Sequence, residues 1–294
     1  MTTQSYQQDQ YMLGIIGHRL SHTLSPIMHT AAFKSLQLNY TYGVMDVIPD
    51  MLPHLIAALR AMNFKGANVT VPYKQSVISL IDEVTEDASI IGAVNTIVND
   101  GGKFIGYNTD VDGIVLSLTQ YKKNIKESNV VIFGAGGATR ATVYALAKYF
   151  TPATITLINR TAEHAQAIAN EFSQRFPTTQ FRFLTNEQSA QSIIESAVLI
   201  INTTSLGMKP YINTHPLPQQ VKLHRSHIVF DVVYNPINTA LLRIAEQAGA
   251  TTINGVAMLL GQGAKAFELF TRTPFPMTVA REAVMKELME HGSV

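Results

Sequence analysis

The stretch "VVIFGAGGATR", residues 130–140, joins an apolar strand to the start of a helix through a glycine-rich turn. Gly134, Gly136 and Gly137 lie in this turn. Glycine there lets backbone amides approach a pyrophosphate closely, and the N-terminus of the following helix favours negative charge. Thr139 takes the sixth position of the usual G-x-G-x-x-G pattern, so we expect slightly looser packing of helix on strand. Because strand, glycines and helix occur in the required order, the stretch favours a dinucleotide site over an ordinary tight turn.

The end of the next strand, in "LINRT", indicates which dinucleotide is bound. NAD sites generally place Asp or Glu here to accept hydrogen bonds from the ribose 2′-hydroxyl, whereas NADP needs a cation for the 2′-phosphate. Here Arg160 is a cation, Asn159 and Thr161 are neutral donors, and no carboxylate occupies the turn. An ordinary surface arginine would give the same pattern. Because Arg160 follows the strand after the glycine loop, the sequence favours NADP as the bound dinucleotide.

Apolar bursts of strand length alternate with segments of helical period in the first half of the chain. They predict strands over residues 11–17, 40–47 and 67–71, and helices over 25–36 and 50–62. Ser25 is the predicted N-cap of the first helix, with Pro26 at its first position. This rhythm predicts an α/β fold with a mainly parallel sheet covered by helices. The segments "AVNTIVND", "GG" and "KFIGYN" then predict a hairpin.

The second half restarts the pattern at the glycine-rich stretch. Further strands are predicted in "TITLINR", "AVLIINTT" and "HIVFDVVY". A helix over "VDGIVLSLTQYKKN" precedes the restart, which predicts a boundary between two α/β domains around residues 110–128. The second domain has the order of elements typical of a Rossmann-like fold.

Composition excludes several classes of protein. The 294 residues include 22 basic and 21 acidic side chains, a formal charge of +1, so nucleic acid is not an expected partner. No cysteine is present, which rules out disulfides and thiolate zinc sites. The first eleven residues lack the apolar core of a signal peptide, and no segment has the length of a membrane span. We therefore expect a cytoplasmic protein with no membrane partner.

Histidines do not predict a metal site. Nine occur, and His18 and His22 stand four residues apart, but no HExxH pattern or matching carboxylate cluster accompanies them. We interpret both as loop residues near the substrate site, and we expect no metal.

A lysine follows the strand in "NVTVPYK", residues 68–74. The β-branched residues favour an extended chain, and Pro72 cannot donate to a central ladder, so the strand should end near it. Lys74 therefore comes just after a strand end, where binding loops gather in α/β proteins. On this stretch alone, a solvated charge is the better interpretation of Lys74.

Nine motifs together resemble the shikimate dehydrogenase family, in order and approximate spacing, from about residue 13 to about 270. The resemblance implies reversible NADPH-linked reduction of 3-dehydroshikimate to shikimate, a step in making aromatic amino acids. It also implies a substrate-binding domain over residues 10–111, completed by helices in 255–294, and an NADP-binding Rossmann-like domain over 112–254. The motifs are "SHTLSP", "GANVTVPYK", "GAVNT", "GYNTD", "GAGGATR", "NRT", "INTTSLGM", "DVVYNP" and "NGVAMLLGQGAKAF".

The resemblance also implies catalytic roles for Lys74 and Asp110. As hydride reaches the C3 carbonyl, negative charge develops on oxygen, and a positioned ammonium can stabilise it and donate a proton. Asp110 would orient that ammonium and bond the neighbouring hydroxyl. Asp110 also precedes a predicted helix, so a capping role is the alternative, and both roles are compatible.

The remaining site residues follow from the same motifs. Thr23 and Ser25 match the two hydroxyl residues that hold the substrate carboxylate, although the first is usually serine. The other substrate-binding residues implied are Thr70, Asn95, Tyr234 and Gln262. The cofactor-binding residues implied are Gly134, Ala135, Gly136, Gly137, Ala138, Asn159, Arg160, Thr161 and Gly255.

Two departures leave alternatives open. Many NADP-specific members carry a second arginine soon after the first, but here Glu163 and His164 stand at those positions. His164 adds positive charge only when protonated. We therefore expect a preference for NADP with a narrower margin. The alternatives are a quinate/shikimate dehydrogenase with NAD or dual cofactor use and, less favoured, a non-catalytic nucleotide-binding regulator. A monomer or a homodimer is expected.

Overall fold

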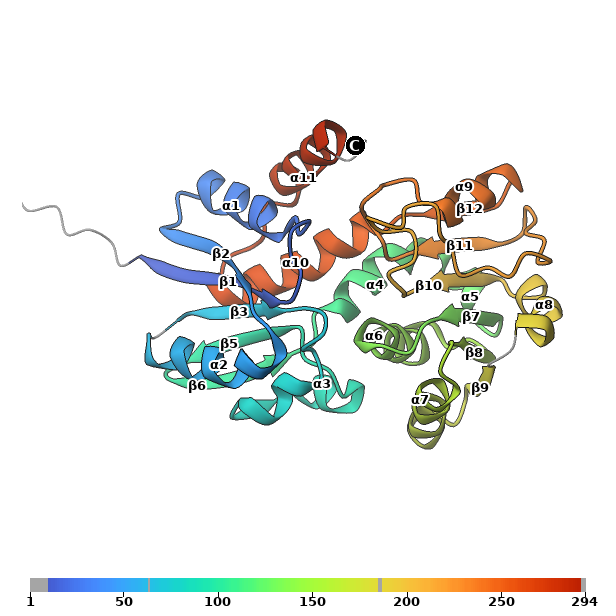
Figure 1. Ribbon diagram of the computed structural model, residues 1–294, viewed down its shortest axis with the longest axis horizontal. Coiled ribbons are helices and arrows are strands. Elements are labelled where there is room, and N and C mark those ends of the chain that lie inside the picture. The colour runs from blue at the N-terminus through green and yellow to red at the C-terminus, as the bar shows by residue number, and fades with distance from the viewer. Residues whose placement is uncertain (1–9, 63, 185–186, 292–294) are drawn as a thin grey trace, which may run out of the picture. The chain divides into compact units, whose positions relative to one another are not determined.

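The computed structural model describes residues 10–62, 64–184 and 187–291, which divide into two compact units (Figure 1). The first unit holds the described chain up to Thr109 together with Gly263–Lys286. The second runs from Asp110 to Gln262 and includes the described chain from Glu287. The predicted α/β class is confirmed in both units. The assignment of roles to residues 10–111 and 112–254 stays a prediction.

The first unit is built on a six-stranded mixed sheet in the order β2-β1-β3-β5-β6-β4. Pairs β1–β2, β1–β3 and β4–β6 are parallel, whereas β3–β5 and β5–β6 are antiparallel. The strands are β1 (Tyr11–Gly17), β2 (Tyr40–Asp46), β3 (Gly66–Val69), β4 (Glu83–Val84), β5 (Thr96–Asp100) and β6 (Lys103–Tyr107).

Helices cover both faces of this sheet, and side chains from β1 and β5 are buried in the core on each side. Phe33 of α1 and Phe267 of α10 pack on one face, and Leu52 and Ile56 of α2 on the other. The helical segments are α1 (Ser25–Ser35), η1 (Pro49–Met51), α2 (Leu52–Ala61), η2 (Ser76–Leu80), α3 (Glu86–Ile91), the second half of α10 (Val256–Thr271) and α11 (Met277–His291) up to Lys286.

Helix α1 begins one residue earlier than its sequence predicts. Leu24 is the N-cap and Ser25 is the first helical residue, so the prediction of Ser25 as N-cap is wrong. The side chain of Leu24 makes no capping hydrogen bond. The Ser25 hydroxyl is instead directed to the buried phenol of Tyr42, which takes it away from a capping role.

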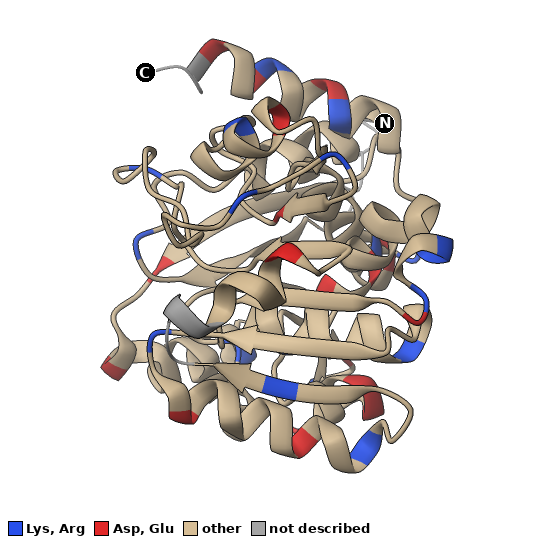
Figure 2. Cartoon of the chain, turned by 90° about the vertical axis from the view of Figure 1, so that its right-hand side faces the viewer, with Lys and Arg blue, Asp and Glu red and all other residues tan. Residues whose placement is uncertain are grey.

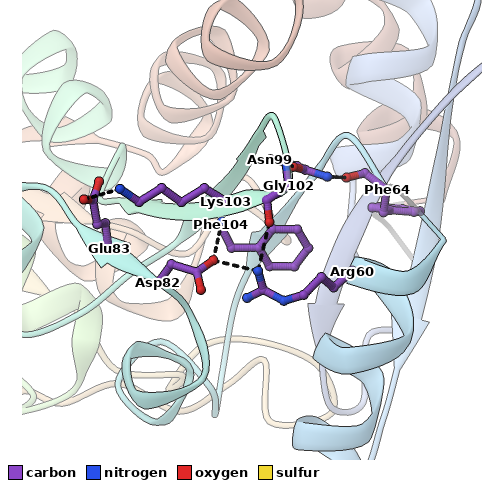
Figure 3. Close-up of polar contacts among 8 residues, drawn as sticks. All are labelled: Arg60, Phe64, Asp82, Glu83, Asn99, Gly102, Lys103 and Phe104. Atoms are coloured by element: carbon purple, nitrogen blue, oxygen red, sulfur yellow. Dashed lines mark hydrogen bonds and ion pairs between the residues drawn. The ribbon is translucent and has the colours of Figure 1, made fainter.

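The predicted hairpin is confirmed, and the side chain of Arg60 in α2 bonds to its turn (Figure 3). The Arg60 guanidinium donates to Asp82 Oδ2 at 2.7 Å and to the Gly102 carbonyl at 2.9 Å, and lies 4.4 Å from the centre of the Phe104 ring. Asn99 Oδ1 accepts from the Gly102 N–H at 2.8 Å. The Phe104 N–H and Arg60 lower the pKa of Asp82. These contacts hold the "GG" turn beside the sheet end.

The second unit is built on a six-stranded sheet in the order β12-β11-β10-β7-β8-β9, and every pair is parallel. This order is that of the Rossmann fold, which reverses between its first and fourth strands, here β7 and β10. Ligands bind such sheets beyond the strand C-termini at this switch point. The strands are β7 (Asn129–Phe133), β8 (Thr154–Ile158), β9 (Gln180–Leu184), β10 (Leu199–Asn202), β11 (Ile228–Asp231) and β12 (Thr251–Ile253).

Helices α8 and α9 pack on one face of this sheet, while α7 packs on β8 and β9. Helix α4 crosses the first half of α10 so closely that a Cβ on Gly261 would lie 2.9 Å from the Gly113 Cα. The helical segments are α4 (Asp110–Leu118), η3 (Thr119–Tyr121), α5 (Lys122–Ile125), α6 (Gly137–Ala145), η4 (Leu146–Phe150), α7 (Ala162–Arg175), α8 (Glu187–Glu195) and α9 (Ala240–Gln247).

Charged residues of both signs are spread over the helices and loops, and most strand residues are uncharged (Figure 2). In the described part of the chain, no helix combines the length and the apolar character needed to cross a membrane.

Candidate active site

The predicted site residues are divided between the two units. Thr23, Ser25, Thr70, Lys74 and Asn95 belong to the first unit. The second unit holds Asp110, Tyr234, Gln262 and all of the predicted cofactor-binding residues.

The loop that leads to Thr23 is fixed by Asp46, at the end of β2. The Asp46 carboxylate accepts the Leu20 N–H at 2.9 Å and the Arg19 N–H at 3.1 Å, and it pairs with His18 Nδ1 at 3.1 Å. The two backbone donors, with His18, lower the pKa of Asp46. Sequence reasoning missed this aspartate, because its partners lie 26 to 28 residues away.

Ser25 lies over a buried aromatic and polar cluster. Burial raises the pKa of the Tyr42 phenol. A hydrogen bond from the Ser25 hydroxyl acts in the opposite direction and lowers this pKa. Tyr42 donates to Asn68 Oδ1 at 2.7 Å, and the His29 ring stacks on Tyr42 with centroids 4.5 Å apart. Burial lowers the pKa of His29 to about 3, so its imidazole is neutral at physiological pH. Thr23 Oγ1 accepts the Ser25 N–H at 3.4 Å.

Lys74 follows the end of β3, as its sequence predicts, but an unpredicted tight turn separates the two. The strand ends at Val69, and Tyr73 N–H donates to the Thr70 carbonyl at 2.9 Å to close the turn. The Lys74 carbonyl then accepts the Val94 N–H at 2.7 Å. The main chain of Lys74 is therefore held beside the "GAVNT" segment that carries Asn95.

Asn95 in turn holds the end of the first unit. Its Oδ1 accepts the Thr109 N–H at 2.7 Å, and its Nδ2 lies 3.0 Å from Thr109 Oγ1. Asp110, the next residue, is the first residue of α4 and is 4% exposed. As the first helical residue it stands one position after an N-cap, so the capping alternative also stays a prediction. The catalytic roles of Lys74 and Asp110 stay predictions.

The glycine loop of the second unit has the features that a pyrophosphate needs. A Cβ on Gly136 would meet no atom within 4 Å, so a ligand can approach its backbone. Thr139 is fully buried and its hydroxyl accepts the Gly136 N–H at 3.0 Å. The hydroxyl thus adds a bond within the loop that a glycine at this position would lack.

The predicted phosphate cation also has a suitable setting. Asn159 Nδ2 donates to the Thr161 carbonyl at 2.8 Å, which closes the turn around Arg160. Arg160 is exposed and, within the described residues, makes no hydrogen bond or ion pair. Glu163 and His164 are exposed in the first turn of α7. A 2′-phosphate could therefore pair with the guanidinium without displacing a protein partner.

The remaining predicted residues of this unit have different settings. Gly255 is a packing glycine, because a Cβ there would lie 2.2 Å from the Val232 carbonyl oxygen. Gln262 is on α10, as predicted, and its Nε2 donates to the Leu259 carbonyl at 2.8 Å. Tyr234 is partly buried three residues after β11 ends.

A buried carboxylate at the end of β11, that of Asp231, was not predicted. Asp231 Oδ1 accepts from Asn202 Nδ2 at 2.9 Å, and Oδ2 accepts from Thr239 Oγ1 at 2.7 Å. Burial raises the pKa of Asp231 to about 6. Asn202 Oδ1 also accepts the Thr204 N–H at 3.0 Å. The available signal for Asn202 was the "NTT" run at the end of the predicted strand "AVLIINTT", since polar residues at strand ends lie at the binding edge.

Comparisons with known proteins decide the family. A model of the "Shikimate dehydrogenase substrate binding domain" matches residues 15–97, and one of "Shikimate / quinate 5-dehydrogenase" matches residues 117–241. A shikimate dehydrogenase (NADP(+)) of Methanocaldococcus jannaschii is 40% identical over 277 residues, covering 94% of this chain and 97% of that protein. The chain belongs to the shikimate dehydrogenase family.

Solved structures of this family agree with the fold. A shikimate dehydrogenase crystallised with NADP+ superposes with a TM-score of 0.86 at 39% identity, covering 95% of this chain and 96% of that one. A quinate dehydrogenase of Corynebacterium glutamicum in complex with NAD gives 0.84 at 32% identity, covering 95% and 100%. The predicted family and the two-domain fold class are confirmed.

Proposed function

We propose that this chain catalyses the reversible NADPH-dependent reduction of 3-dehydroshikimate to shikimate. The single observation that carries the proposal is the 40% identity to an NADP-dependent shikimate dehydrogenase over nearly the whole of both chains. The open approach to Gly136 and the exposed, unpaired guanidinium of Arg160, judged among the described residues, support NADP as the cofactor.

NADPH would supply the hydride. The cofactor would be held by the glycine loop, Asn159, Arg160 and Thr161. Thr23 and Ser25 bind the substrate carboxylate, while Thr70, Asn95, Tyr234 and Gln262 bind its other polar groups. Lys74 stabilises the negative charge that develops on the carbonyl oxygen and delivers a proton to it. Asp110 orients the ammonium group of Lys74.

The near-neutral charge of the chain argues against a nucleic-acid partner. We place the enzyme in the cytoplasm as a monomer or homodimer.

A second candidate, a quinate/shikimate dehydrogenase, is favoured by the likeness to the quinate dehydrogenase. Thr23 also stands where the family usually has serine. Threonine keeps the hydroxyl donor but adds a methyl group that changes the space around the carboxylate. The added methyl group takes up space at this end of the substrate, so the likeness to the quinate dehydrogenase is the observation that carries this second candidate.

The test is oxidation of shikimate or quinate by the purified chain with NADP+, followed by nicotinamide absorbance and by chromatography of the product. We expect NADPH and 3-dehydroshikimate in equal amounts from shikimate, and much slower turnover of quinate. Comparable kcat/KM for both substrates would establish the second candidate. Binding of NADP+ without turnover of either would indicate a nucleotide-binding regulator.

A further inference from the structure

Two threonine hydroxyls form a directed hydrogen-bond chain beneath the glycine loop. Thr203 Oγ1 donates to the Phe133 carbonyl at 2.7 Å. Thr139 Oγ1 lies 2.8 Å from Thr203 Oγ1 and accepts the Gly136 N–H at 3.0 Å. Because a hydroxyl has one hydrogen and Thr203 uses its own on Phe133, Thr139 must donate to Thr203. The chain therefore runs from Gly136 through Thr139 and Thr203 to Phe133.

This chain joins the two sides of the switch point. Phe133 ends β7 and Thr203 directly follows β10, and the Thr203 N–H also donates to the Phe133 carbonyl at 2.9 Å. A Cβ on Gly134 would lie 2.5 Å from Thr203 Oγ1 and 3.0 Å from Thr139 Oγ1. The paired hydroxyls thus occupy the space that a side chain at position 134 would fill.

The hydrogen bonds of the glycine loop also determine which backbone N–H groups are available to a ligand. The Gly134 N–H donates to the Ile158 carbonyl at 2.9 Å, and the Gly136 N–H is taken by Thr139. Within the described chain, the N–H groups of Ala135, Gly137 and Ala138 donate to no protein acceptor. These three groups belong to the turn and the first turn of α6, where an anion is favoured.

We propose that the Thr139–Thr203 hydroxyl pair is a positioning element for the cofactor. This role requires no contact between either hydroxyl and the ligand. By turning the Gly136 N–H inward and fixing the loop to β10, the pair aims the amides of Ala135, Gly137 and Ala138 at the pyrophosphate. The inference rests on the proposed binding of NADP and adds how this chain organises its glycine loop without the third glycine of the usual pattern.

The test is a double-mutant cycle read by NADP+ binding. Thr139→Val and Thr203→Val remove one hydroxyl each at nearly constant shape. We expect each to weaken NADP+ binding about tenfold in titration calorimetry, the order expected when a well-made hydrogen bond is lost. The double variant should be little weaker than either single one, because one break already opens the chain. Thr139→Ser and Thr203→Ser keep the hydroxyl and should bind within about twofold of wild type.

Adenosine 2′-phosphate is the control ligand, because it carries the 2′-phosphate for Arg160 but no pyrophosphate. Its affinity should be the same in wild type and valine variants. Wild-type NADP+ affinity in Thr139→Val, additive losses in the double variant, or equal weakening of adenosine 2′-phosphate would each overturn the inference. If a valine variant does not fold, the alanine variants provide the same comparison. A wild type that fails to bind NADP+ would overturn the proposed function, and the inference with it.

Discussion

Asn95 Oδ1 accepts the backbone N–H of Thr109 at 2.7 Å, and so joins two motifs that are separated by a complete hairpin. Through Val94 the same segment also holds the Lys74 carbonyl. The side chain of Asn95 therefore fixes the backbone next to Asp110, while the main chain of its neighbour Val94 fixes the backbone of Lys74, in addition to the proposed contact of Asn95 with substrate.

Replacing Asn95 by alanine tests this role. Asn95 and Thr109 are 2% and 1% exposed, so the variant leaves a buried N–H without its acceptor. We expect unfolding free energy to fall by about 1–3 kcal/mol in urea titrations, together with a lower kcat/KM for shikimate. Thr109→Ser, which keeps both bonding groups, is the matched control and should behave as wild type. Unchanged stability in Asn95→Ala would contradict the prediction.

Lys74→Ala should lower kcat by on the order of 100-fold or more, because the ammonium acts on charge that develops only in the transition state. Titration with NADP+ should give an affinity close to wild type.

Asp110→Asn should also have a low kcat, since it keeps the shape of the side chain but loses the charge that orients Lys74. A variant Asp110→Asn that loses only stability would favour the capping role.

Asp231 predicts a pH dependence of stability. Its folded pKa is about 6, whereas an unfolded aspartate has a pKa near ~4. Between these values the folded chain retains a proton that the unfolded chain has lost, so Asp231 makes stability fall as pH rises from about 4 to 6. Above about 6 its contribution is constant.

Asp231→Asn cannot titrate, and we expect it to remove this contribution. Urea unfolding of both proteins across this pH range gives the difference in their unfolding free energies. That difference should change between about pH 4 and 6 and be level above 6. Parallel curves throughout would show that Asp231 is not a buried titrating group.

Gly113→Ala should destabilise the crossing of α4 and α10. Its Cβ would lie 2.4 Å from the Met258 carbonyl oxygen, a backbone atom that cannot move cheaply. We expect a loss of about 1–3 kcal/mol despite alanine's better helix propensity. Gly43→Ala is the control, because a Cβ there meets nothing within 4 Å. Thermal unfolding of both variants decides the point, and equal melting temperatures would contradict the tight crossing.

The sequence predicts local elements well where the hydrophobic periodicity and the turn-forming residues indicate the same boundaries. The strand over residues 11–17 and the hairpin after "GAVNT" are found as predicted, because alternation and the "GG" turn are local signals. The strand predicted over 67–71 ends two residues early at Val69. There the chain turns so that Thr70 can accept the Tyr73 N–H, a bond that β-branched composition does not reveal.

The side-chain networks were not predictable in the same way. Asp46, Asp231 and the Thr139–Thr203 pair bond to groups that are distant in sequence, and their partners are fixed only by strand order. Pattern reasoning placed Thr139 as a departure from the glycine motif. Its bond to Thr203 depends on β10 lying next to β7, which no local pattern specifies.

The central claim, NADP-linked oxidation of shikimate with Arg160 as the phosphate-binding cation, is tested most directly by the ratio of kcat/KM for NADP+ to that for NAD+. The ratio is measured with saturating shikimate in wild type, Arg160→Ala and His164→Arg. An arginine can make a bidentate pair with phosphate, so we expect wild type to prefer NADP+, Arg160→Ala to lose the preference, and His164→Arg to increase it. Equal efficiency with both cofactors in wild type, unchanged in Arg160→Ala, would contradict the account.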